Sequence, residues 1–338
     1  MDKIEKQITS RTEEAGKTYR FDNEHDSSLP AQWWFQNPPE GLTLFIVFYT
    51  QACRWAQCLG CSLPSKVSQY HVSYREIIKQ VDYLFREIIT DDQKRDLRKI
   101  IVSNNGSILD EDTFSTTALF YFIAKMNLEC PHIGTLTLEA RPEYADFSEL
   151  ELLARAVAEG DSPTRLELAI GFEAFDEKIR NDYFRKGLSL EKFEKFAADC
   201  ARFRHRLKVY FMLKPVPQIT EEEAVLDVKN AIDYLDSLAV SLKLDINMHL
   251  NPTYVPSGTL LEQAFQEGGY SPPSLENLIA CLLHAQGRRI TIYAGIDDEG
   301  LAVPGGTFMH GHDRDVYHAL EEFNRLQDYE ILRRLLPG

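Results

Sequence analysis

Three cysteines lie within nine residues in the first fifth of the chain. Cys53, Cys58 and Cys61 follow closely after an apolar run at 42–49, LTLFIVFY. Three thiolates on one short loop can converge on a single metal centre, and such soft sulfur ligands favour iron–sulfur clusters, zinc or Cu(I). This loop is therefore the first place in the sequence where we expect chemistry.

The number of available ligands narrows the choice of metal. A zinc site recruits a fourth Cys or His at a short, recognisable spacing. The first downstream candidate is His71, ten residues after Cys61, and no further Cys-x-x-Cys pair follows. Three ligands without an obvious fourth predict a [4Fe–4S] cluster whose remaining iron is open to a small molecule. A structural zinc loop is the alternative that the residues leave open.

The bulk composition bounds the partners and the compartment. The 338 residues carry a formal net charge of -15, which repels phosphate backbones unless a local basic patch overrides it. We therefore expect a small-molecule substrate, and nucleic acid is disfavoured. The N-terminus is charged and leads into no apolar stretch of a signal peptide. No apolar run reaches the roughly 18 residues that a membrane span needs, so we expect a cytoplasmic protein without contact to a membrane.

Short apolar runs alternate with longer amphipathic runs from residue 42 onward. The expected strands are 42–49, 99–103, 134–139, 165–170, 207–213 and 244–250, with a further strand at 288–293. The expected helices are 72–89, 112–126, 147–158, segments after 176 and after 189, 221–238, and one helix running from after 313 toward 335. Six strands separated by helices predict right-handed βαβ crossovers and a parallel sheet. Such sheets collect their chemistry on loops at the carboxyl ends of the strands, where the cysteine loop lies.

The cysteine loop after a first strand, in a six-fold β/α pattern, resembles the radical S-adenosylmethionine superfamily. The usual spacing in that superfamily is three and then two intervening residues, whereas here it is four and then two, which other branches share. Motifs after four later strands resemble the radical component of archaeosine synthase and, more distantly, the radical domain of the elongator catalytic subunit. They are GSILD at 106–110, LEARPE at 138–143, AIGFE at 169–173 and LNPT at 250–253. The resemblance covers about residues 40–330.

The resemblance implies a fold, two cofactors and a partner. The fold is a partial (β/α)6 TIM-like barrel at 41–285, with an N-terminal arm at 1–40 that reads as polar and irregular and a C-terminal extension at 286–338. Cys53, Cys58 and Cys61 would hold one [4Fe–4S] cluster. Its open iron would bind S-adenosylmethionine, and an electron from the reduced cluster would break a carbon–sulfur bond, usually releasing a 5′-deoxyadenosyl radical. A reducing partner such as flavodoxin or ferredoxin would supply that electron.

Several residues near strand ends could hold the cofactor. Gly106 lets the backbone approach a ligand closely, with Asn104 and Ser107 as polar partners. Glu139 and Arg141 share one face if the strand continues through both, so they could accept from the amino group or ribose and clamp the carboxylate, respectively. A turn in the first case and an internal ion pair in the second are the structural alternatives.

Three further residues are candidates for the substrate or the cofactor. Glu173 could contact the ribose or the substrate, Lys214 ends the fifth strand and could meet an acidic group, and Asn251 could hydrogen-bond adenine or the substrate. We expect Arg180, Arg185 and Lys186 to be solvated, although the resemblance favours one of them as a carboxylate partner.

The remaining thiols and histidines are expected to be structural. Cys130, Cys200 and Cys281 lie far apart in or beside helical runs, where buried cysteine is common. The tail segment 309–315, MHGHDRD, could ligate a metal through two histidines, but we favour a polar loop followed by a helix N-cap. Relatives of the archaeosine type carry cysteines in this part of the chain, and their absence here speaks against a tRNA substrate.

The sequence thus predicts a radical S-adenosylmethionine enzyme that acts on an unidentified, small-molecule substrate. Three alternatives stay open: modification of a tRNA base, transfer of a 3-amino-3-carboxypropyl group to a nucleophile or metalloid, and a non-catalytic zinc-binding interaction protein. The residues do not identify the second substrate, the bond of the cofactor that breaks, the electron donor or the oligomeric state.

Overall fold

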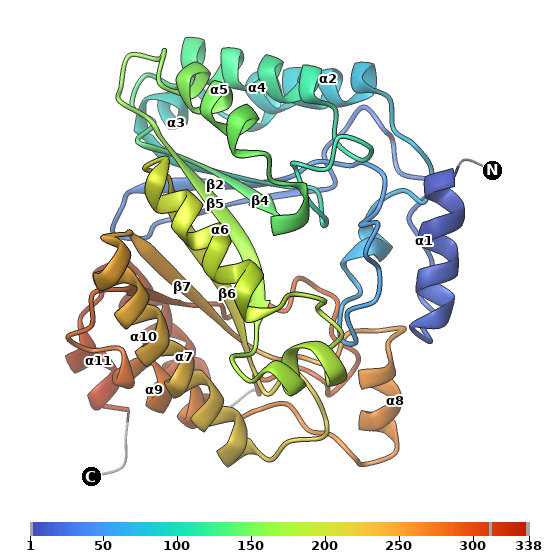
Figure 1. The fold of residues 1–338 in the computed structure, drawn as a ribbon, viewed down its shortest axis with the longest axis vertical. Helices are drawn as coiled ribbons and strands as arrows, with labels where there is room; N and C mark the ends of the chain where they lie inside the picture. The colour runs from blue at the N-terminus through green and yellow to red at the C-terminus, as the bar shows by residue number, and fades with distance from the viewer. Residues whose placement is uncertain (1–2, 311–312, 336–338) are drawn as a thin grey trace.

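The computed structural model describes residues 3–310 and 313–335, whose strands form one sheet (Figure 1). The strand order in space equals the order in the chain, β1 to β8. β1 pairs antiparallel with β2, and every later neighbouring pair is parallel. The strands are β1 Gln32–Gln36, β2 Leu42–Val47, β3 Leu97–Ser103, β4 Thr135–Ala140, β5 Arg165–Glu173, β6 Arg206–Leu213, β7 Ile246–Pro252 and β8 Thr291–Ala294.

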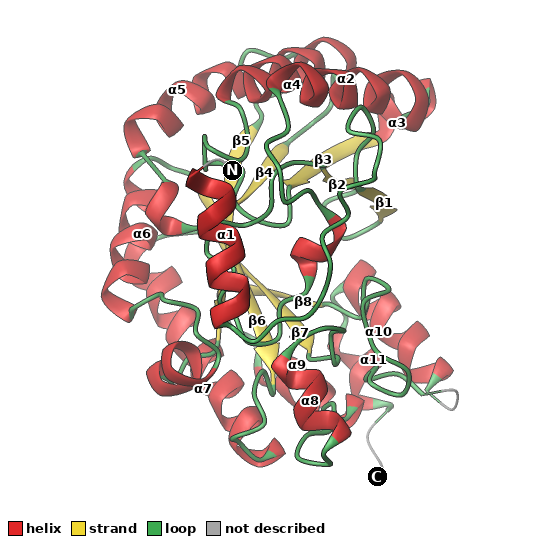
Figure 2. Ribbon diagram, turned by 90° about the vertical axis from the view of Figure 1, so that its right-hand side faces the viewer, coloured by secondary structure: helices red, strands yellow, loops and turns green. Residues whose placement is uncertain are grey.

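Helices connect the parallel strands and cover the outer face of the curled sheet (Figures 1 and 2). The connecting helices are α2 Tyr74–Tyr83, α3 Asp91–Asp96, α4 Thr116–Glu129, α5 Phe147–Val157, α6 Leu190–Arg202, α7 Glu221–Leu242, α8 Leu260–Gln266 and α9 Leu275–His284. Short 3-10 and π-helical turns are η1 Leu63–Lys66, η2 Leu84–Ile88, η3 Pro142–Tyr144 and η4 Lys178–Tyr183. The parallel sheet predicted from the β/α alternation and the partial barrel implied by the resemblance are therefore confirmed.

The two faces of the sheet differ in chemistry because side chains alternate along each strand. Leu44, Ile100, Leu138 and Leu168 are among the fully buried residues of the main core, which lies between the sheet and its helices. The inner face is polar instead. Among the residues on that face are Lys99, Glu167, Lys208, Tyr210 and His249. The interior of the barrel is therefore lined by charged and polar side chains, while the hydrophobic core lies outside the barrel.

The first 40 residues are more ordered than predicted. They contain helix α1 Lys3–Glu14 and strand β1, so the prediction of an irregular arm is wrong. Ile8 is fully buried under α1, and Trp34 of β1 stacks on Phe45 of β2 with ring centroids 4.2 Å apart. A polar helix and a five-residue strand carry weak periodicity, and contacts with the barrel decide their structure.

The end of the chain contains two helices where one was predicted. α10 Arg314–Leu326 ends at Gln327, whose φ of 54° is left-handed, and α11 Tyr329–Arg333 follows. Asp328 caps α11 by accepting from the Glu330 N–H. The predicted division at residues 40 and 285 stays a prediction, although β1 and β8 both join the common sheet. Within the described residues, no helix is long and apolar enough to cross a membrane.

Candidate functional site

The cysteine loop leaves β2 at the carboxyl end of the parallel strands and is fixed from two sides. Arg54 donates two hydrogen bonds to Asp110, at 2.6 and 2.5 Å, in the segment after β3. The Leu59 N–H donates to the Phe184 carbonyl at 2.8 Å, in the segment after β5. A bidentate arginine–carboxylate pair of this kind fixes orientation as well as distance. The loop therefore has a defined conformation set by the barrel.

Trp55 adds a third anchor between the cysteines. Its ring lies between the guanidinium groups of Arg11 and Arg141, which are 5.4 and 4.7 Å from the ring centroid. Its Nε1–H donates to the Arg185 carbonyl at 2.9 Å. A side chain at Gly187 would overlap the indole, so this position needs glycine. Arg11 belongs to α1, so the N-terminal helix packs directly on the cysteine loop.

A cavity of about 920 Å³ opens at this end of the barrel, and all three thiols of the loop line it. Ligand pockets usually measure about 300–1,000 Å³, so this one is at the large end of the range. Its wall continues from the cysteines across the strand ends to β1, β8 and α10. Across the open edge of the sheet, the Tyr293 hydroxyl donates to Oε1 of Gln36 at 3.1 Å. The cavity is therefore bounded by both edges of the half-barrel.

The donor set suits a cluster better than a single ion. Burial, together with the charges of Cys58 and Cys53, raises the pKa of the Cys61 thiol to about 12 against the opposing charge of Lys17, so a bound metal would be needed to keep this sulfur ionised. The sulfurs around one zinc ion lie within about 4 Å of each other, given Zn–S bonds of about 2.3 Å. Among residues 3–310 and 313–335, no three Cys, His, Asp or Glu side chains converge in that way. Ligands to separate iron atoms of one cluster need no such convergence.

Gly106 leaves room beside the first cysteine. A Cβ at this position would stand 3.3 Å from Cys53 Cα and 3.4 Å from Cys53 Cβ, which is tighter than ordinary side-chain packing. The backbone after β3 can therefore approach the cysteine loop closely only because residue 106 is glycine. The residues present thus fit a cluster at this loop with a ligand beside it.

Eight of the predicted site residues line this cavity together. Besides the three cysteines they are Gly106, Glu139, Arg141, Glu173 and Asn251. They come from the ends of β2, β3, β4, β5 and β7, as expected for chemistry collected at the carboxyl edge of a parallel sheet.

Several of these side chains already have protein partners. Glu139 accepts from the Tyr210 hydroxyl at 2.5 Å, and burial raises the pKa of its carboxyl. Arg141 donates to Glu143 at 2.5 Å and to the Lys186 carbonyl at 3.0 Å. β4 ends at Ala140, yet Glu139 and Arg141 still reach the same cavity.

Three predicted residues lie outside the cavity lining. Asn104 is fully buried and donates to Thr50 at 3.2 Å, and its Oδ1 has no hydrogen-bond partner among the described residues. Ser107 accepts from the Arg141 N–H at 3.1 Å, so it shapes the turn after β4. Lys214 donates to Ser271 at 3.3 Å and lies over the Tyr270 ring. None of the three is among the residues that line the cavity, and their predicted contacts with ligands stay predictions.

The prediction that the cations after β5 are solvated is wrong for two of them. Arg180 is fully buried and donates to the carbonyls of Leu188, Ala174 and Phe175. Lys186 lines the cavity and pairs with Glu173 at 2.7 Å. Arg185 is exposed as expected. The π-helical turn η4 directs Arg180 inward, a feature that helical periodicity does not predict.

Sequence reasoning missed other residues of the cavity wall. Lys17, Trp34, His249, Tyr254 and Glu299 all line it. Lys17 and Trp34 belong to the segment read as an arm. His249 lies one residue from the LNPT motif on an inward position of β7, which period-2 counting from Asn251 identifies. Glu299 has a positive φ of 56°, and nothing in the sequence predicts that backbone conformation.

The sequence analysis expected the remaining cysteines and the tail histidines to be structural. Cys130, Cys200 and Cys281 are buried, as predicted. His310 precedes α10, and its N–H donates to Asp313, the residue before the helix, at 2.7 Å. His312, the second histidine of the predicted pair, lies outside the described residues.

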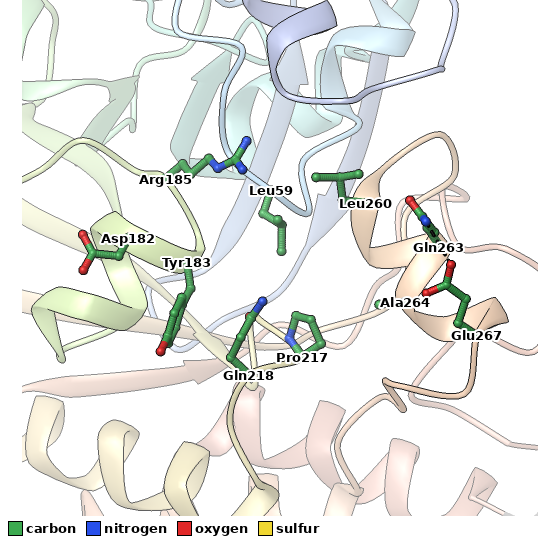
Figure 3. Close-up of a pocket in the computed structure, with 10 residues that line it drawn as sticks. All are labelled: Leu59, Asp182, Tyr183, Arg185, Pro217, Gln218, Leu260, Gln263, Ala264 and Glu267. Carbon is green, nitrogen blue, oxygen red and sulfur yellow. Dashed lines mark hydrogen bonds between the residues drawn. The ribbon is translucent and has the colours of Figure 1, made fainter.

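A second, smaller cavity of about 280 Å³ lies on the other side of Leu59 (Figure 3). Its wall comes from the cysteine loop, η4, the segment after β6 and helix α8. Figure 3 shows Gln263 and Glu267 of α8 on one side and Asp182 and Tyr183 on the other. No cysteine lines it, so the large cavity is the candidate site.

Comparisons with known proteins agree with this geometry. No family model matches the sequence. The chain is 26% identical over 268 residues to archaeosine synthase subunit beta of Methanosarcina acetivorans, covering 76% of this chain and 72% of that protein. It is 24% identical over 310 residues to the protein of the same name from Thermococcus kodakarensis, covering 88% of this chain and 89% of that one.

The fold is similar to that of archaeal Elp3 from Methanocaldococcus infernus. The TM-score is 0.50 at 16% identity, and the match covers 74% of this chain and 58% of that chain. The chain thus spans somewhat more than half of the solved Elp3 structure. The resemblances predicted from the sequence, in motifs and in fold, are confirmed.

Proposed function

We propose that this chain is a radical S-adenosylmethionine enzyme that holds one [4Fe–4S] cluster and S-adenosylmethionine in the large cavity and acts on a small second molecule. One observation carries the proposal: the three thiols of a single rigid loop line one large cavity at the carboxyl end of a parallel half-barrel. When bound, the reduced cluster supplies the electron that cleaves a carbon–sulfur bond of the cofactor.

The chain's own residues would hold and orient these groups. Cys53, Cys58 and Cys61 would ligate the cluster, with Gly106 giving the cofactor close access to the loop. Arg141 is stacked on Trp55 and bonded to Glu143, so it would present a fixed positive charge beside the cysteines. The Glu173–Lys186 pair at 2.7 Å would close the adjacent wall. Helix α1 crosses this end of the barrel in Figure 2 and would limit the access of water.

The far wall of the cavity supports a small, uncharged or cationic second substrate. Asp297, Glu299, Glu321 and Glu322 line it on the tail side. The stacked rings of Trp34 and Phe45 line the same cavity. Carboxylates at the rim repel phosphates, whereas flat apolar rings accept a small organic body.

Reconstitution under anaerobic conditions tests the proposal. We expect about four irons per chain and, after reduction, turnover of S-adenosylmethionine with release of a nucleoside. Release of 5′-deoxyadenosine would identify cleavage toward the ribose, and methylthioadenosine would identify transfer of the 3-amino-3-carboxypropyl group. Stoichiometric zinc without iron or sulfide would refute the proposal and support a zinc-binding interaction protein.

Modification of tRNA is a second candidate, because two relatives are named as subunits of archaeosine synthase. It requires binding of a polyanion by a chain of net charge -15 whose cavity rim is acidic. Salt-sensitive binding of tRNA at low ionic strength would support it. If tRNA does not bind at low ionic strength, this candidate is refuted and a small molecule stays the proposed substrate.

A further inference from the structure

Lys17 is a buried cation without an ionic partner at the edge of the cysteine loop. It is 7% exposed and lines the large cavity. Its Nζ donates to the Cys61 carbonyl at 2.9 Å and lies 5.5 Å from the centroid of the Tyr19 ring. An ammonium group has three hydrogen-bond donors, so a single carbonyl leaves most of its capacity toward the cavity.

The other cations of the cavity wall are paired. Arg141 is bonded to Glu143, Lys186 to Glu173, and Arg325 lies 3.9 Å from Glu322. Within the described part of the chain, Lys17 is the one lysine or arginine of this wall for which no carboxylate lies within 4 Å. Burial of an unpaired charge is costly unless an opposite charge compensates it. Since no carboxylate of the described residues supplies that charge, the geometry points to an anion bound in the cavity or at the cysteine loop.

The backbone holds Lys17 in place without any ligand. The Thr18 N–H donates to the Gly258 carbonyl at 3.0 Å, and a Cβ on Gly16 would meet Leu260 at 2.9 Å. A Cβ on Gly258 would overlap Tyr19. The segment after α1 is thus packed between the cysteine loop and α8 (Figure 1). Such pre-organisation is expected of a binding residue, because it lowers the entropic cost of binding.

We propose that Lys17 binds the carboxylate of S-adenosylmethionine, so that the N-terminal segment supplies part of the cofactor site. This inference rests on the proposed function. The carboxylate is the anionic group of that cofactor, and the Cys61 carbonyl places the ammonium beside a cluster ligand. The negative charge of the cluster itself is the competing explanation, and the experiment separates the two.

The experiment compares two probes on the reconstituted full chain. S-adenosylmethionine carries the carboxylate, and decarboxylated S-adenosylmethionine lacks it. The variants are Lys17→Met, which removes charge and donor; Lys17→Gln, which keeps a donor for the Cys61 carbonyl; and Lys17→Arg, which keeps the charge. Lys195→Met, on the exposed face of α6, is the matched control. Four quantities are measured for each protein: iron and sulfide content, dissociation constants from equilibrium dialysis, the midpoint potential of the cluster, and the electron paramagnetic resonance change on adding cofactor.

We expect Lys17→Met and Lys17→Gln to weaken binding of S-adenosylmethionine by about 10- to 100-fold, as for loss of one hydrogen bond to a charged group. Binding of the decarboxylated probe should change by less than about twofold, because the pair of probes isolates the coupling to the carboxylate. Lys17→Arg should restore most of the affinity, and Lys195→Met should match the wild type.

Other results would overturn the inference. Equal losses for both probes, or unchanged binding of S-adenosylmethionine, would exclude a contact with the carboxylate. A lowered midpoint potential with unchanged cofactor affinity would show instead that Lys17 compensates the cluster. A wild-type protein that assembles no cluster would refute the proposed function itself, an outcome separate from failure of the Lys17 contact.

Discussion

Two regions of the half-barrel differ in the partners of their buried charges. One is the floor, which we define as Glu40, Lys99, Glu167 and Arg206, and the other is the cysteine end. On the floor, Lys99 lies 2.7 Å from Glu167 and 3.0 Å from Glu40, and Arg206 bridges the same two carboxylates. At the cysteine end, Lys17 has no carboxylate partner in the described chain. On the floor, Lys99 and Arg206 therefore share two carboxylates, while the neighbouring Lys208 donates to the neutral Asn247 at 2.7 Å. At the cysteine end, Arg141 and Lys186 are paired with Glu143 and Glu173, and Lys17 is the cation for which we propose a partner in the bound cofactor.

The pKa values of two carboxyls in the half-barrel interior, one on the floor and one on the tail side of the cavity, also differ. On the floor, the positive charges of Lys99, Lys208 and Arg206 outweigh burial and hold the pKa of Glu167 at about 2. At the tail side of the cavity, burial and neighbouring carboxylates raise the pKa of Glu299 to about 7. Compensated charges stabilise the fold, whereas uncompensated charges in a cavity mark a place where a ligand binds. The predictions below test this comparison.

The largest effect is expected at the cysteine loop. Cys58→Ala removes one of three cluster ligands and should abolish both a full iron content and cleavage of S-adenosylmethionine. Iron and sulfide analysis with product chromatography measures this. Cys200→Ala is the control. Cys200 is a buried residue of α6 that does not line the cavity, so this variant protein should keep its full iron content. A Cys58→Ala protein with four irons and normal turnover would show that the ligands are assigned wrongly.

On the floor, Glu167→Gln should destabilise the protein by about 3–5 kcal/mol, because it leaves buried cations without their partner. Urea unfolding followed by tryptophan fluorescence reports the free energy of unfolding. The matched control is Asp245→Asn, which breaks a half-exposed pair with Arg165 and should cost less than about 1 kcal/mol. If both variants lose equally little, the floor network does not depend on mutual compensation.

Glu299 should make stability fall as pH rises from about 4.5 to 7. In this window the native carboxyl keeps a proton that the unfolded chain has lost, so the unfolded state binds fewer protons. Glu139, Asp297 and Asp298 raise this pKa and Tyr254 lowers it. At about 1.4 kcal/mol per pKa unit the effect is at most about 3 kcal/mol, and partial exposure to the cavity reduces it.

Unfolding free energies measured across this pH range should therefore be flatter in Glu299→Gln than in the wild type. Glu159→Gln, at an exposed turn after α5, is the control and should keep the wild-type slope. An unchanged slope in Glu299→Gln would show that the tail-side wall is not an uncompensated acidic region.

The smallest effect is expected from the support of the cysteine loop. Asp110→Asn removes the carboxylate that holds Arg54, and loss of such an outer contact should speed iron release to a chelator by about tenfold. Asp112→Asn is the control, because its side chain is half exposed and contacts only the other guanidinium nitrogen. Release rates are followed by the absorbance of the iron–chelator complex. Equal rates in the two variants would contradict a loop fixed through Asp110.

The order of the strands and the position of the cysteine loop were readable from the chain. β-Strands with apolar outward residues, such as 136–138 and 166–170, alternate with amphipathic helices, and this pattern is local. Cap signals were local as well. Ser73, three residues before Glu76, accepts from the Glu76 N–H at the start of α2. The strand β1 and the break at Gln327 were not predicted, because long-range contacts set them.

The sequence by itself indicated the candidate ligand set and the scaffold, because three thiols within nine residues and a six-fold β/α repeat are properties of neighbouring residues. Only the tertiary structure decided which polar residues face the cavity. It placed Asn104 behind the wall, buried Arg180 among carbonyls, and brought Lys17 from the end of α1 to Cys61, 44 residues away along the chain. The physical reason is that electrostatic compensation depends on which charges meet in space, and spacing in the chain does not encode those meetings.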